Sequence, residues 1–168
     1  MRAAAAVLLF AACLLAGGLA RDALRRGVRS LEQLCLFLRR LRFHARMRRP
    51  LGAAITEMAG DPDLAQLAFL PECAALCRRG TPLPQAWRQT AEPFMCRLQA
   101  VCGQTPPVAS YIPALAAADG RQVDALLELY EAQARDALEH ARQRSAHLGR
   151  LCVQVGGAVG VLLGIMIL

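Results

Sequence analysis

The sequence predicts an all-α protein, a multi-helix bundle of about six helices between two terminal transmembrane helices. Hydrophobic residues make up 55% of the 168 residues but aromatic residues only 5%. Alanine, leucine and arginine dominate, a composition that favours helix over strand. A long apolar segment without charge lies at each end of the chain, whereas the middle is rich in charge. We therefore expect a transmembrane helix over 1–20, one helical domain over 21–150 and a second transmembrane helix over 151–168.

The first apolar segment contains no charge from Ala3 to Ala20. As a helix this segment is about 27 Å long, enough to cross a bilayer core. The rival interpretation is a cleaved signal peptide, because Gly18-Leu19-Ala20 before Arg21 is similar to a cleavage site. One arginine precedes the segment and four follow it closely, which favours an uncleaved anchor with its downstream side in the cytoplasm.

The second apolar segment, Leu151 to Leu168, is interrupted only by the neutral Gln154. Three glycines recur in it every four residues, so they form one smooth stripe on a helix. A double GxxxG stripe allows another membrane helix to approach closely, and the first segment is the obvious partner. The stripe consists of Gly156, Gly160 and Gly164.

The topology follows from the arginines on the domain side of both segments, which include Arg142, Arg144 and Arg150 before the second. By the positive-inside rule, the middle of the chain lies in the cytoplasm and both termini face outward. We expect a multi-pass membrane protein, with membrane lipids around the terminal helices.

The middle of the chain is expected to form a series of helices separated by turns. The first helix continues to about Arg49 with an apolar face of Leu24, Val28, Leu31, Cys35, Leu38 and Leu41. The other expected helices cover residues 51–59, 64–79, 93–102, 108–117 and 121–168. The helix over 64–79 is expected to break or kink at Pro71. One more helix is expected to be capped by Thr81, with Pro82 in its first turn. Asp61 is expected to cap a turn, Gly80 to end a helix and Trp87 to be a buried anchor. The two long helices form stalks with the shorter helices packed between them.

The formal net charge of +7 comes from arginine alone, since the sequence contains no lysine. The arginines alternate with acids along helical stretches and do not alternate regularly with aromatic residues or glycines, so nucleic acid is not the expected partner. Solvated helix faces near an anionic membrane surface explain the charge better.

Sites for catalysis or metal binding are not predicted. His140 and His147 are two helical turns apart, too far to share one metal ion, and His44 lies among arginines. Cys73 and Cys77 have helical spacing without a second pair that would complete a zinc site, so we expect the cysteines to be small core residues in a reducing compartment.

Motifs of hydrolases and metalloproteases are absent, and without lysine a Walker-type nucleotide site is impossible. The chain is expected to be no enzyme, with no cofactor and no small-molecule substrate. A pore subunit is disfavoured too, because the terminal segments carry no charge that would form an ion path.

The order of these elements resembles that of the stage III sporulation protein AB family. The resemblance covers most of the chain and rests on short motifs: Gly80, Leu83, Ala86 and Trp87; Asp119 and Gln122; and Leu148-Gly149. Where the family often has Leu-Gly before the aspartate, this chain has Ala116-Ala117-Ala118, a departure from the pattern.

The resemblance implies a subunit of the channel complex between mother cell and forespore, in the mother-cell membrane. That subunit is similar to the F-type inner-membrane platform proteins of type II secretion and type IV pilus machines. Its implied partners are other channel subunits, including a cytoplasmic ATPase (the AA component), with a homo-oligomer left open. The alternatives are a platform-like subunit of another secretion or pilus machine, or a helical binding domain with a signal peptide.

Overall fold

The computed structural model describes residues 2–103, 106–117 and 120–167, with only the backbone at the outer ends of the two long helices. Every element within these ranges is helical, which confirms the all-α class. The elements are α1 (Arg2–Arg46), α2 (Leu51–Met58), the 3-10 helix η1 (Pro62–Leu64), α3 (Phe69–Arg78), α4 (Leu83–Cys102), α5 (Val108–Ala117) and α6 (Gly120–Ile167).

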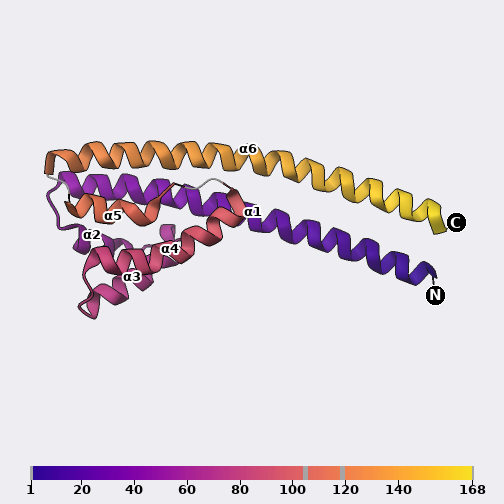
Figure 1. The fold of residues 1–168 in the computed structure, drawn as a ribbon, viewed down its shortest axis with the longest axis horizontal. Helices are drawn as coiled ribbons and strands as arrows, with labels where there is room; N and C mark the ends of the chain where they lie inside the picture. The colour runs from indigo at the N-terminus through magenta and orange to yellow at the C-terminus, as the bar shows by residue number, and fades with distance from the viewer. Residues whose placement is uncertain (1, 104–105, 118–119, 168) are drawn as a thin grey trace.

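Two long antiparallel helices, α1 and α6, dominate the fold (Figure 1). Their 45 and 48 residues correspond to about 68 and 72 Å of helix. They make the most extensive contact of any pair of elements, and both termini lie at the same end of the molecule. The prediction that each stalk is one unbroken helix is confirmed.

The shorter helices do not pack between α1 and α6 as the sequence predicted. They lie on the side of α1 away from α6, where α2, η1 and α4 contact α1, and α5 touches α6 through the stacked rings of Tyr111 and Tyr130 (Figure 1). The reason is the width of the apolar face of α1, where Leu31, Leu34, Phe37, Leu38 and Leu41 are all buried. At about 100° per residue these five positions span about 120° of the helix surface, wide enough for α1 to pack against α6 and the shorter helices at once.

Trp87 lies at the centre of the core, where four helices meet. It is fully buried, its ring stacks on Phe37 of α1 at 5.8 Å, and Phe69 of α3 meets it edge-on at 5.0 Å. Its indole Nε1 donates a hydrogen bond to the carbonyl oxygen of Val108, the first residue of α5. The predicted packing anchor is confirmed, and this one side chain ties α1, α3 and α5 to α4.

Gly80 ends α3, as expected from the sequence. Its φ is +91°, and its amide donates to the carbonyl of Cys77 while the amide of Thr81 donates to that of Leu76. These two bonds form a Schellman motif, which favours glycine at the left-handed position. Asp61 likewise caps η1, because its carboxylate accepts a hydrogen bond from the amide of Asp63.

Three of the predicted helix boundaries at prolines are wrong. Pro71 neither breaks nor kinks a helix, because α3 begins at Phe69 and the proline falls in its first turn. Thr81 is not the N-cap of α4: Pro82 occupies that position and Pro84 lies in the first turn. No new helix begins at Pro93, because α4 continues through it to Cys102.

The continuation of α4 through Pro93 has a packing reason. Thr90, Ala91, Met95 and Leu98 are buried on both sides of the proline, on one continuous face. A proline inside a helix costs about 3 kcal/mol, and burying several side chains at roughly 1.5–3 kcal/mol each for the large apolar ones outweighs that cost.

Candidate functional site

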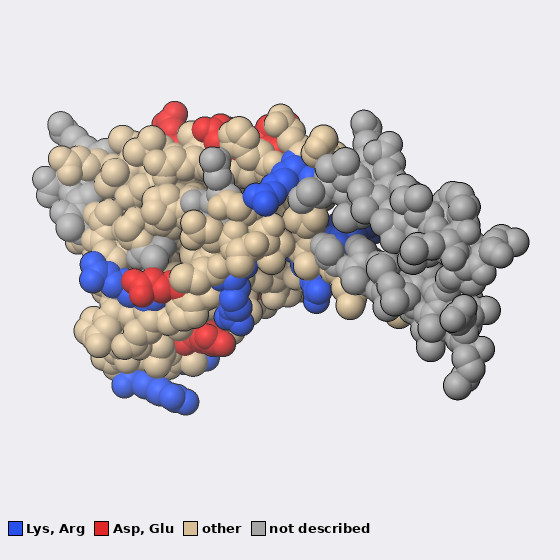
Figure 2. All heavy atoms as spheres, turned by 45° about the vertical axis from the view of Figure 1, so that its right-hand side comes forward, with Lys and Arg blue, Asp and Glu red and all other residues tan. Residues whose placement is uncertain are grey.

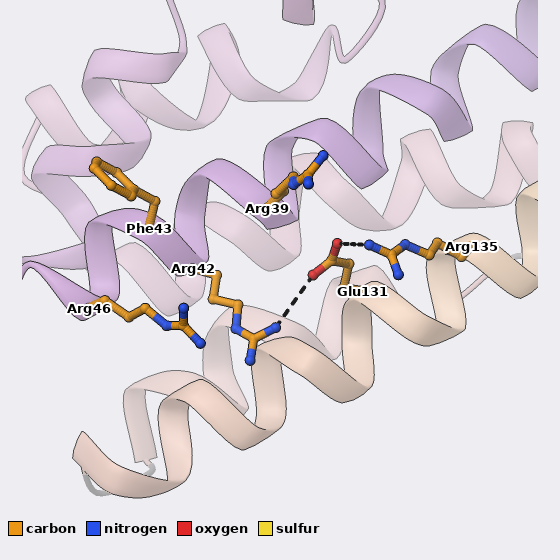
Figure 3. Close-up of a pocket in the computed structure, with 6 residues that line it drawn as sticks. All are labelled: Arg39, Arg42, Phe43, Arg46, Glu131 and Arg135. Atoms are coloured by element: carbon orange, nitrogen blue, oxygen red, sulfur yellow. Dashed lines mark hydrogen bonds and ion pairs between the residues drawn. The ribbon is translucent and has the colours of Figure 1, made fainter.

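An arginine-lined groove lies between α1 and α6, toward the end of the molecule away from the termini. It has a volume of about 320 Å³ and is lined by Arg39, Arg42, Phe43 and Arg46 of α1 and by Glu131 and Arg135 of α6. Figure 3 shows Glu131 between the side chains of Arg42 and Arg135, each reaching it from a different helix. We call this site the distal groove.

Arg42 organises the groove, because its guanidinium faces three carboxylates of α6. Nε lies 2.7 Å from Asp124 Oδ1, Nη2 lies 2.6 Å from Glu128 Oε2 and Nη1 lies 3.7 Å from Glu131 Oε2. The three acids are spaced four and three residues apart, so they share one face of α6. This network fixes the distance and register of α1 against α6 at the groove.

The electrostatics of the groove follow from these pairs. Hydrogen bonds from Arg42 and then Arg46 hold the pKa of the Asp124 carboxyl well below its usual range. The same bond to Asp124 raises the pKa of Arg42. Glu131 is only 7% exposed, and Arg135, four residues later, also pairs with it. Every carboxylate at the groove is therefore engaged by an arginine.

Other groups at the groove are left for a partner. Arg39 is exposed and forms no ion pair with any residue in the described ranges. Phe43 is 58% exposed and Met47, one turn further along the chain, is 60% exposed. A free cation beside exposed apolar side chains suits an acidic protein segment with an apolar residue.

Sequence reasoning missed the distal groove. Helical spacing alone favours ion pairs of Glu128, Glu131 and Asp136 within their own helix, with Arg135 and Arg142. Only the pair of Glu131 with Arg135 forms that way; Glu128 pairs with Arg42, and Arg142 pairs with Glu32 of α1 at 2.7 Å. The signal was present as complementary stripes, with arginines 39, 42 and 46 on one face of α1 and acids 124, 128 and 131 on one face of α6.

The motif residues carried by the family resemblance have structural positions. Ala86 and Trp87 are fully buried, Leu83 packs against the core and Gly80 ends α3. Gln122 is exposed near the start of α6. Asp119 lies outside the described residues, as do the side chains around the glycine stripe of 156, 160 and 164. Gly80, Leu83, Ala86 and Trp87 therefore serve the fold, and together with Gln122 they form no reactive cluster.

The cysteines differ more than the sequence predicted. Cys73 and Cys102 are buried, but Cys96 is exposed, so it is not the small core residue expected. Burial and the neighbouring Cys77 raise the pKa of Cys73 to about 12. In the part of the chain that the structure describes, no three histidine, cysteine or acidic side chains are arranged to hold a metal ion.

Membrane-spanning helices are not found among the residues that the structure describes. None of the helices there is long and apolar enough to cross a bilayer. The predicted segments 1–20 and 151–168 fall mostly on residues whose side chains lie outside the described part, and they stay predictions.

Comparison with known proteins identifies the chain at the level of its family. The family described as stage III sporulation protein AB matches residues 2–168. Comparisons with curated proteins and with solved structures found no match. A match over nearly the whole chain agrees with the resemblance carried by the segments around Gly80 to Trp87 and Asp119 to Gln122. The chain therefore belongs to the stage III sporulation protein AB family.

Proposed function

We propose that this chain is a non-enzymatic membrane platform subunit of the sporulation channel complex between mother cell and forespore. It couples a cytoplasmic ATPase, the AA component, to membrane partners. The observation that carries the proposal is the antiparallel pairing of α1 and α6, which brings both apolar ends to one end of the molecule (Figure 1). The helical domain and the distal groove extend toward the other end.

This arrangement suits a platform physically. Two apolar helix ends side by side are suited to crossing a bilayer together, and the glycine stripe of 156, 160 and 164 permits close packing there. We place the domain in the cytoplasm of the mother cell, because arginines flank the domain side of both segments.

The distal groove is the proposed docking site for the ATPase. It lies toward the end of the molecule away from the termini, and it combines exposed Arg39 with exposed Phe43 and Met47. Arg39 and Phe43 also take no part in the ion pairs that hold α1 to α6, so their side chains remain available to a partner.

Co-purification from sporulating cells tests the function. We expect the tagged full-length chain to bring down the AA-component ATPase and other channel subunits. The double variant Arg39→Glu/Phe43→Ser should lose the ATPase but keep the membrane partners, because it reverses the free charge and removes the apolar contact. The matched control, Arg97→Glu/Leu129→Ser, changes an exposed arginine and a 51% exposed leucine elsewhere. Equal loss in both variants would contradict docking at the groove.

Two further measurements test the membrane assignment. The full chain should stay in the membrane through a carbonate wash, and external protease should not reach the central domain in sealed cells. Release by carbonate would overturn the anchor, and digestion of the domain from outside would overturn the topology.

A further inference from the structure

Apart from Arg39 of the distal groove, the described arginines of α1 fall into two groups with different surroundings. In the group farther from the N-terminus, Arg40 pairs with Asp61 and Asp63, Arg42 with three acids of α6, and Arg46 with Asp124. Just beyond α1, Arg49 pairs with Glu57 at 2.9 Å. These arginines serve the packing of the domain.

The group next to the first apolar segment behaves differently. All four of its arginines are exposed, and none forms an ion pair with the residues that the structure describes. They are Arg21, Arg25, Arg26 and Arg29. Asp22 is the single acid among them, so residues 21–29 carry four positive charges, one negative charge and a net charge of +3. We call these four residues the proximal arginines.

The position of the proximal arginines is set by the continuity of α1. The helix runs without interruption from the apolar segment into the domain, so these arginines lie within about 14 Å of the segment's end at Ala20. Arg21, Arg25 and Arg29 recur every four residues along one face. Figure 2 shows basic side chains, all of them arginine in this chain, where the described part meets the grey part.

Such a cluster has no role in the fold and costs free energy through repulsion between like charges. The attraction between an arginine and a charged membrane surface falls off over about 10 Å at 0.1 M salt. That distance covers about the first two turns of α1 after the apolar segment. The guanidinium group binds phosphate through two parallel hydrogen bonds. At the surface of a membrane crossed by the first apolar segment, the phosphates within reach belong to phospholipid headgroups.

We propose that the proximal arginines bind the headgroups of anionic phospholipids in the membrane that holds the chain. This inference rests on the membrane anchoring proposed above. A headgroup is favoured over an acidic protein because the helix itself places these arginines at the membrane surface, whereas a protein would have to reach the crowded base of two long helices.

The test uses the full-length chain in phosphatidylcholine vesicles containing a trace of spin-labelled lipid. Electron paramagnetic resonance gives the association of labelled phosphatidylglycerol relative to labelled phosphatidylcholine. We expect a preference for phosphatidylglycerol on the order of three-fold or more at low salt, falling toward one in about 0.5 M NaCl. The variant Arg21→Gln/Arg25→Gln/Arg26→Gln/Arg29→Gln should show no preference.

The matched control replaces four exposed arginines of the domain by glutamine: Arg78, Arg79, Arg88 and Arg97. It loses the same charge and should keep the full preference, and the fluorescence of buried Trp87 checks that both variants fold. An equal loss in the control, or no preference in the wild-type chain, overturns the proposal. So does a proximal variant that keeps its lipid preference but loses co-purified channel subunits, which would assign these arginines to a protein partner. Carbonate extraction distinguishes failure of this inference from failure of the proposed membrane anchoring. A chain that stays in the membrane but shows no lipid preference contradicts only the inference, whereas a chain that is released contradicts the anchoring.

Discussion

The indole Nε1 of Trp87 donates a 2.8 Å hydrogen bond to the carbonyl oxygen of Val108, inside the core. The bond joins α4 to the start of α5 across a separation of 21 residues. Because neither group is accessible to water, each depends on the other for its hydrogen bond.

We expect Trp87→Phe to destabilise the protein by about 1–3 kcal/mol, because an aromatic ring remains but the Val108 carbonyl loses its donor. Trp87→Ala should cost about 3–5 kcal/mol, since it also leaves a cavity. Urea unfolding of the full chain in detergent, followed by circular dichroism, measures both effects. Leu129→Ala, at a 51% exposed position, should change stability by less than about 0.5 kcal/mol. A neutral Trp87→Phe would contradict the importance of the bond.

Gly27 of α1 lies close against the C-terminal end of α4. A Cβ at this position would lie 2.6 Å from the Sγ of Cys102 and 3.3 Å from a methyl carbon of Val101. We expect Gly27→Ala to destabilise the protein by about 1–3 kcal/mol despite alanine's better helix propensity. The double variant Gly27→Ala/Cys102→Ala should recover part of the lost stability, because it removes the Cys102 sulfur that the added methyl group would meet.

Gly52 of α2 is the control for this prediction, since a methyl group at that position would meet no atom closer than 4.0 Å. Gly52→Ala should be neutral or stabilising by up to about 1 kcal/mol. Thermal unfolding of the set gives the comparison, and equal behaviour of the two glycines would exclude the contact with α4 as the cause.

Gly80 is the left-handed residue of the Schellman motif, with open space around it. Gly80→Ala should therefore cost about 1–2 kcal/mol through backbone strain alone, and Gly80→Asn should cost less. Gly60→Ala is the reference, because Gly60 does not have a positive φ and the nearest atom to an added methyl group is 4.0 Å away. The melting temperatures should rank wild type, Gly80→Asn, Gly80→Ala; a reversed order of the variants would argue against the strain.

The pH dependence of stability should report the pairs between α1 and α6. Arg42 and Arg46 depress the pKa of Asp124, so its contribution is fully present above the unfolded value of about 3.9. It is lost as the pH falls below that value toward the folded pKa. The melting temperature of wild type should exceed that of Asp124→Asn at pH 6, with the difference shrinking as the pH falls from about 4 to 2. A constant difference over this range would show that the carboxylate's charge is irrelevant.

Cysteine reactivity should separate Cys96 from Cys73. Cys96 is exposed, whereas Cys73 is fully buried and has a pKa raised to about 12, so little of it is thiolate. At pH 8 iodoacetamide should alkylate Cys96 within minutes and leave Cys73 unmodified, as mass spectrometry of the digested protein would show. Both should react in denaturant; rapid labelling of Cys73 in the folded chain would contradict its burial.

The helical class, the unbroken α6, the Gly80 terminus and the buried Trp87 could all be predicted from the sequence. Each depends on local chemistry: helix propensity, a glycine after an apolar run, or a single large aromatic residue. The family could be recognised for the same reason, because its motifs are short segments read in order.

What only the tertiary structure decided was which surfaces meet. The continuation of α4 through Pro93, the packing of α1 against both α6 and the shorter helices, and the pairing of Arg42 with Asp124, 82 residues away, depend on contacts between distant segments. Local rules predict a helix boundary at Pro93 and ion pairs within α6, since the nearest signals in the sequence favour both. Packing energy summed over many distant contacts outweighed those preferences, and sequence spacing alone carries no measure of that sum.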